Sequence, residues 1–150
     1  MSRKLLAALP KNLFDDTAFY NDWKSKQSTY IYKERMDGEQ VFRIYDGDLL
    51  YSKDDGFKMR VQVGKIYTFS LYTLRALDDT TNNTSCLIIR NGSENKSIAA
   101  TANWTRYTFT FMANENYVYV CSGRSRYKYC YIKNIQLEEG TKATDYEPFE

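Results

Sequence analysis

The chain has 150 residues, enough for one domain with a hydrophobic core of its own. Its net charge of +2, from 21 basic and 19 acidic residues, is too balanced to indicate a nucleic-acid-binding protein. There is no histidine, so the commonest general base and zinc ligand are missing. Three cysteines without a CxxC pair argue against a zinc site and a disulfide framework, and fit reduced thiols in a protein made in a cytosol.

The first element that the sequence predicts is a short helical segment at residues 3–9, which Pro10 would end. Its apolar part, residues 5–9, is too short for a secretion signal or a membrane span. Beyond Pro10 the sequence predicts only strands and turns, and Asp-Gly pairs mark several of the turns. In the first half the expected strands are apolar or aromatic stretches at residues 12–14, 17–23, 28–33, 40–45, 49–51 and 58–63.

The second half contains the clearest strands. In the stretch 65–76, Tyr67, Phe69 and Leu71 alternate with polar residues, which is typical of a strand with one buried face. Further strands are expected at residues 86–90, 97–102, 104–112, 117–121 and 127–137. About nine or ten short strands without a second helix predict an all-β jelly-roll sandwich of two antiparallel sheets. We expect residues 1–11 to be an N-terminal leader and residues 12–150 to be the domain.

The closing segment, residues 131–148, carries a specific pattern: an apolar strand, then Gln136-Leu137-Glu138-Glu139-Gly140, then Ala143-Thr144 and Glu147-Pro148. It resembles the end of the carbohydrate-binding-module-like jelly rolls found in tail, baseplate and other structural proteins of bacteriophages. Three earlier segments agree with this family in the expected order, at residues 12–14 with Trp23, 67–71 and 104–111. The resemblance implies a jelly-roll fold and a place on a virion.

The closing segment also has a physical meaning of its own. Gly140 can take a positive φ where the last strand ends and the chain turns away. Residues 144–148 would then form an extended tail laid across a sheet edge, which would prevent that edge from pairing with another chain. The segment therefore indicates the fold and does not by itself demonstrate saccharide binding.

The resemblance further implies a possible structural calcium ion between the opening and closing strands, near Asn12, Asp15 or Asp145. Oxygen ligands of this kind suit calcium. Scattered acidic residues without a ligand spacing are nevertheless typical of an ordinary surface. Our prediction is that the protein has no cofactor and no metal, and the calcium ion remains the alternative.

Four pairs of adjacent carboxylates could suggest a glycosidase, at residues 15–16, 54–55, 78–79 and 138–139. A glycosidase needs two carboxyl groups on opposite sides of one bond, whereas these pairs all fall at expected turns. No nucleophile and base are recognisable either. The sequence therefore predicts no catalytic residues and a protein that is not an enzyme.

Tyrosine is unusually frequent, with 14 residues, and it gathers in the late strands. In these strands Val118, Val120, Cys130 and Ile132 have the parity expected for the core, so the tyrosines between them would face outward. Exposed tyrosine and arginine side chains suit a saccharide site or a protein interface. The candidate saccharide-binding residues are Tyr117, Tyr119, Arg124, Tyr127, Tyr129 and Tyr131, with Tyr30 and Tyr32 as a second pair.

Leu5, Leu6 and Leu9 in the leader are candidates for an anchor on a larger particle. Together these features predict a non-enzymatic phage virion accessory protein, made in the bacterial cytoplasm, whose jelly roll binds host surface saccharide during adsorption. The alternative is a capsid or tail decoration protein that acts only through protein contacts; a cellular adhesin module is a more distant third. Expected partners are other virion proteins and host polysaccharide, with no nucleic acid and no membrane, and the protein would be multi-copy or homo-oligomeric.

Overall fold

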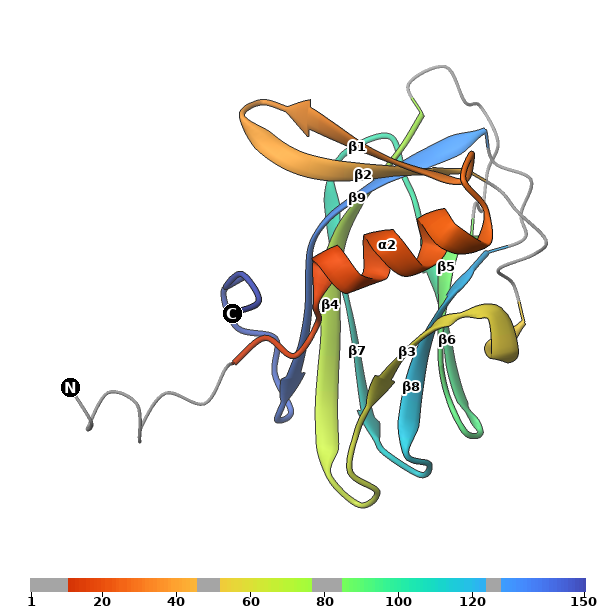
Figure 1. The fold of residues 1–150 in the computed structure, drawn as a ribbon. Helices are drawn as coiled ribbons and strands as arrows, with labels where there is room; N and C mark the ends of the chain where they lie inside the picture. Colours follow the sequence, from red (N-terminus) through yellow and green to blue (C-terminus); the bar gives the residue numbers. More distant parts are fainter. Residues whose placement is uncertain (1–10, 46–51, 77–84, 124–127) are drawn as a thin grey trace.

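The computed structural model describes residues 11–45, 52–76, 85–123 and 128–150, which form a two-layer β-sandwich (Figure 1). Its elements are α2 (Asp16–Lys26), β1 (Ile31–Met36), β2 (Glu39–Tyr45), the 3-10 turn η2 (Lys53–Asp55), β3 (Phe57–Arg60), β4 (Ile66–Arg75), β5 (Ser85–Asn91), β6 (Glu94–Ala99), β7 (Thr105–Met112), β8 (Tyr117–Ser122) and β9 (Tyr129–Glu139). Residues 1–10 of the predicted leader, including Leu5, Leu6 and Leu9, and the predicted strand at 49–51 lie outside the described residues. No helix in the described part is long and apolar enough to span a membrane.

The nine strands of the described residues form two sheets in which every neighbouring pair is antiparallel. One sheet has five strands in the order β1-β2-β9-β4-β7, and the other has four in the order β3-β8-β5-β6. The predicted all-β sandwich of two antiparallel sheets is confirmed. β4 and β7, the strands with the strongest alternation in the sequence, pair along eight residues from Ile66↔Met112 to Thr73↔Thr105.

The core lies between the two sheets and is rich in aromatic side chains. From β4 it receives Phe69 and Leu71, both fully buried. The four residues predicted to face inward from the late strands, Val118, Val120, Cys130 and Ile132, are also buried, so that prediction is confirmed. Phe14 and Phe57 join this core, with ring centroids 5.7 Å apart.

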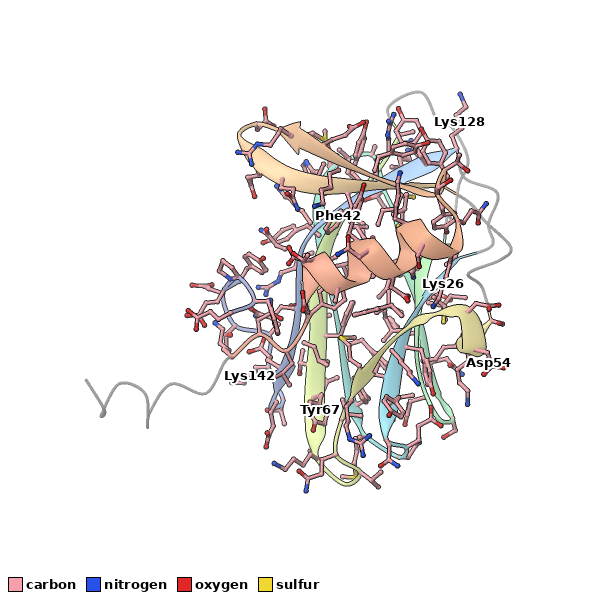
Figure 2. The ribbon with its side chains drawn as sticks, viewed as in Figure 1. Lys26, Phe42, Asp54, Tyr67, Lys128 and Lys142 are labelled. Carbon is pink, nitrogen blue, oxygen red and sulfur yellow. The ribbon has the colours of Figure 1, made fainter. Side chains whose placement is uncertain are left out.

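The prediction of strand pieces at residues 17–23, and of no further helix, is wrong. Residues 16–26 form the helix α2, which lies against the open side of the sandwich between β1 and β3 (Figure 1). Phe19 and Trp23 are one helical turn apart and both fully buried, with ring centroids at 4.5 Å. Phe42 of β2 lies beside the helix (Figure 2), with its ring 5.8 Å from that of Phe19. Aromatic residues suit a buried strand as well as the buried face of a helix. The composition of residues 17–23 therefore could not distinguish the two structures.

The tail does not simply cover a sheet edge, because β9 lies in the middle of its sheet. β2 pairs only with the first part of β9, Tyr129–Ile132. Beyond that point Leu13 N donates to Leu137 O at 2.7 Å, so the opening segment continues the pairing. The tail then binds the side chains of Gln136 and Glu138, which are both buried. Gly140 has φ +128°, in agreement with the expected turn.

Candidate functional site

The predicted tyrosine face is divided between the two sheets. Tyr117 and Tyr119 lie on β8 in the four-stranded sheet, whereas Tyr129 and Tyr131 lie on β9 in the five-stranded sheet. Since the residues between them point into the shared core, the two pairs face opposite sides of the molecule. The expectation of one combined face is therefore corrected to two faces. The remaining candidates, Arg124 and Tyr127, lie outside the described residues.

On the five-stranded sheet, Tyr129 and Tyr131 belong to what we call the Arg43 cluster. It consists of Tyr32, Arg43, Tyr45, Tyr129 and Tyr131, from the adjacent strands β1, β2 and β9. The Arg43 guanidinium carbon lies 5.1 Å from the ring centroid of Tyr32 and 5.5 Å from those of Tyr45 and Tyr129. The tyrosine rings also contact one another, at 5.8 Å for Tyr32–Tyr45, 5.5 Å for Tyr45–Tyr129 and 5.4 Å for Tyr129–Tyr131. Three amphipathic rings thus lie around one cation, and the ring of Tyr131 packs against one of them.

Charge and burial act on two side chains of the Arg43 cluster, Arg43 and Tyr131. Glu34 Oε1 lies 2.9 Å from Arg43 Nε, so the guanidinium is held on one side by a carboxylate. Burial, together with the neighbouring Tyr129 and Glu34, raises the pKa of Tyr131 to about 12. The Tyr131 hydroxyl is thus protonated at neutral pH, and its hydrogen bond with Tyr129 links the two rings.

A second group of side chains, the Trp104 cluster, extends the same sheet toward β7. It consists of Tyr72, Trp104, Arg106 and Lys133. Lys133 Nζ lies 4.4 Å from the ring centroid of Trp104 and 5.8 Å from that of Tyr72, and Arg106 lies 5.8 Å from Tyr72. We call the two clusters together the outer aromatic face. Four strand spacings separate β1 from β7, or ~19 Å, so the face can contact several units of an extended ligand.

The opposite sheet carries a smaller cluster around Tyr117. Lys58 Nζ lies 4.7 Å from the Tyr117 ring centroid, and Arg60 Nη1 donates to the Tyr117 hydroxyl at 3.0 Å. Lys53 Nζ lies 5.5 Å from the ring of Tyr119. The Tyr117 cluster has two aromatic rings, 6.3 Å apart. It therefore offers less aromatic area than the outer aromatic face, which has six.

The second predicted pair, Tyr30 and Tyr32, is also divided. Tyr32 joins the Arg43 cluster, whereas Tyr30 is buried and its hydroxyl bonds to Ser122 Oγ in the core. Sequence reasoning missed the remaining members of the face. For Arg43 and Tyr45 a signal existed, because they alternate with the buried Phe42 and Ile44. The missed residues are Arg43, Tyr45, Tyr72, Trp104, Arg106 and Lys133.

The residues considered for calcium have other contacts. Asn12 Oδ1 accepts hydrogen bonds from Phe14 N and Leu137 N, and Asp15 Oδ1 accepts one from Ala18 N. The backbone oxygen of Asp145 accepts a hydrogen bond from Lys11 Nζ. Within the described ranges no group of three His, Cys, Asp or Glu side chains is placed to hold a metal ion. Asn12 and Asp15 thus have structural roles that require no ion.

No protein-family model matches this sequence, and no curated protein matches it. Solved structures with a similar fold include a carbohydrate-binding module described as "CBM4 structure and function", with 16% identity, a TM-score of 0.47, and coverage of 73% of this chain and 78% of that one. The CBM22-1 xylan-binding domain of Paenibacillus barcinonensis Xyn10C has 10% identity, a TM-score of 0.45, and coverage of 75% and 81%. A structure described as "BiXyn10A CBM1 APO" has 12% identity, a TM-score of 0.48, and coverage of 89% and 91%. These similarities are to the β-sandwich fold of carbohydrate-binding modules, and at these scores they carry no argument about a ligand.

Proposed function

We propose that this domain binds saccharide, without catalysis, on the outer aromatic face. The observation that carries the proposal is the Arg43 cluster, in which three tyrosine rings lie around one guanidinium and a fourth, Tyr131, packs against Tyr129, all on three adjacent strands. Tyrosine rings offer apolar faces that suit the C–H faces of sugar rings. The Arg43 guanidinium and the tyrosine hydroxyls add hydrogen-bonding groups for the hydroxyls of a sugar.

A non-catalytic role is supported by the contacts of the paired carboxylates. Asp15 caps α2, and Glu138 accepts hydrogen bonds from Thr144 N at 3.1 Å and from Thr144 Oγ1 at 2.7 Å. Glu139 lies 3.4 Å from Lys65 Nζ. These carboxylates stabilise local structure, and the proposed ligand surface is built from aromatic and cationic side chains.

The proposed setting is a bacteriophage virion, with the domain contacting a polysaccharide of the host surface and other virion proteins. This part of the proposal rests on the resemblance of residues 131–148 to phage structural jelly rolls. A decoration protein with protein contacts alone is the competing proposal. Binding of the isolated domain to a saccharide separates the two.

The test is affinity electrophoresis of the isolated domain through gels containing xylan, mannan, dextran or purified bacterial cell-wall polysaccharide, followed by pull-down on whole cells. We expect retardation in at least one gel. Tyr129→Ala should weaken that binding about tenfold or more, because it removes a central ring that contacts both Tyr45 and Tyr131. Circular dichroism should show that the variant remains folded, since Tyr129 is only partly buried.

Tyr119→Ala is the matched control, because it removes a similarly exposed tyrosine from the opposite sheet. Its retardation should equal that of the unmodified domain. Binding that survives Tyr129→Ala but not Tyr119→Ala would move the site to the four-stranded sheet. Absence of retardation in every gel and on cells would overturn saccharide binding and favour the decoration role.

A further inference from the structure

A pocket of about 220 Å³, lined by both polar and apolar groups, lies beside the outer aromatic face, at the point where β2 and β9 stop pairing. We call it the notch pocket. Four segments surround it: the start of α2, the start of β2, the middle of β9 and the tail. Its lining consists of Asp16, Glu39, Gln40, Phe42, Lys133, Asn134, Ile135 and Tyr146.

The notch pocket exists because β9 is irregular at Asn134. The register with β4 shifts there, from Ser70↔Gln136 to Tyr72↔Lys133, and Asn134 has φ 52°. A left-handed conformation is unfavourable for most residues, although asparagine tolerates it better than others. Such conformations persist where the surrounding structure imposes them and often accompany binding sites.

The chemistry of the lining suits a single sugar ring. Phe42 and Ile135 are buried apolar residues, and the other six lining residues offer both donors and acceptors. Burial, with a smaller contribution from Asp16, raises the pKa of Tyr146, so its hydroxyl remains a donor at neutral pH. The volume lies below the ~300 Å³ at which pockets for drug-sized ligands begin, so the pocket fits one ring and not a longer chain.

Lys133 joins the notch pocket to the outer aromatic face. Its Nζ lies over the Trp104 ring on the face, and it also lies 3.2 Å from Glu39 Oε1 at the pocket. A chain that continued past the pocket would have to displace α2 or the tail. α2 is held by the buried side chains of Phe19 and Trp23, and the tail by the hydrogen bond from Glu147 N to Gln136 Oε1.

From this geometry we infer that the notch pocket holds the terminal sugar of a chain bound across the outer aromatic face, so that the domain recognises chain ends. The inference rests on the proposed function, because the remaining sugars would lie on the Arg43 and Trp104 clusters. Gln40 and Asn134 would provide planar amide groups for the hydroxyls of that terminal unit.

The test uses xylohexaose, mannohexaose and cellohexaose, measured by isothermal titration calorimetry with the full chain. We expect Gln40→Ala and Asn134→Gly each to weaken hexasaccharide binding by up to about tenfold, as for one lost hydrogen bond. Asn134→Gly should not lower the thermal unfolding midpoint, since glycine accepts a positive φ. Arg35→Ala is the control, because Arg35 lies in the same hairpin but outside the pocket lining.

A second measurement tests directly whether the domain recognises the end of the saccharide chain. Each hexasaccharide is compared with two derivatives, one blocked at the non-reducing end and one reduced to the alditol. We expect one of the two modifications to abolish the contribution of Gln40. Equal binding of all three forms, with Gln40→Ala and Asn134→Gly unchanged but Tyr129→Ala impaired, would overturn chain-end recognition alone. Failure of every hexasaccharide and polysaccharide to bind would instead overturn the proposed function.

Discussion

At the residue scale, Asn12 joins three distant parts of the chain. Its Nδ2 donates to Ile135 O at 3.0 Å and to Glu147 O at 2.9 Å. Its Oδ1 accepts from Phe14 N at 2.9 Å and Leu137 N at 3.2 Å. The side chain is buried and completes the backbone hydrogen bonding of β9 where β2 no longer pairs with it. The residue considered as a calcium ligand is thus a connector between the opening segment, the last strand and the tail.

Replacing Asn12 should therefore lower the free energy of unfolding much more than replacing a surface asparagine. Asn12→Ala leaves buried backbone groups without partners, and we expect the free energy of unfolding to fall by about 3 kcal/mol. Urea denaturation measures this change, with the exposed Asn103→Ala as the control. Asn12→Asp should also destabilise, since its carboxylate would face the carbonyls of Ile135 and Glu147. A loss for Asn12→Ala no larger than that for Asn103→Ala would contradict this role.

At the element scale, α2 closes the open side of the sandwich. Asp15 begins it by accepting a hydrogen bond from Ala18 N at 3.0 Å, and Lys24 and Lys26 lie in its last turn. Phe19 and Trp23 attach the helix to the core, and Tyr30 packs edge-on against Trp23 at 5.2 Å. The helix thereby supports the inner side of the β1–β2 hairpin, whose outer side carries Tyr32, Arg43 and Tyr45.

Substitutions of Asp15, the N-cap of α2, test how much the helix contributes to stability. Asp15→Ala should lower the free energy of unfolding by about 1 kcal/mol, because Ala18 N loses its acceptor. Asp15→Asn should lower the free energy of unfolding much less, because asparagine caps helices about as well as aspartate does. The midpoint of urea denaturation checks both variants. If the two substitutions destabilise equally, the charge of Asp15 matters more than its capping hydrogen bond.

At the scale of the whole molecule, the sandwich separates two tyrosine-bearing surfaces. The outer aromatic face lies on the five-stranded sheet, and the Tyr117 cluster lies on the four-stranded sheet. The core between them is shared, so a substitution on one surface can leave the other intact. The two surfaces can therefore be tested separately by substitution.

The leader belongs to the same scale, because its predicted role is attachment of the whole domain. Residues 12–150 include both sheets and the described core, so we expect a variant lacking residues 1–10 to fold with an unchanged thermal midpoint. If Leu5, Leu6 and Leu9 are the anchor, this variant should be lost from purified particles. Quantitative mass spectrometry of the particles measures that loss, and full incorporation would reject the anchor.

The sequence by itself determined most of the strands, the sandwich class and the outward direction of Tyr117, Tyr119, Tyr129 and Tyr131. These features follow from local alternation, which the chain carries wherever a strand has one buried face. Only the tertiary structure decided which strands share a sheet. It brought Tyr45 opposite Tyr129, separated Tyr119 from Tyr131 and converted residues 16–26 into a helix. Strand pairing depends on backbone hydrogen bonds and core packing between distant segments, and neither leaves a local mark in the sequence.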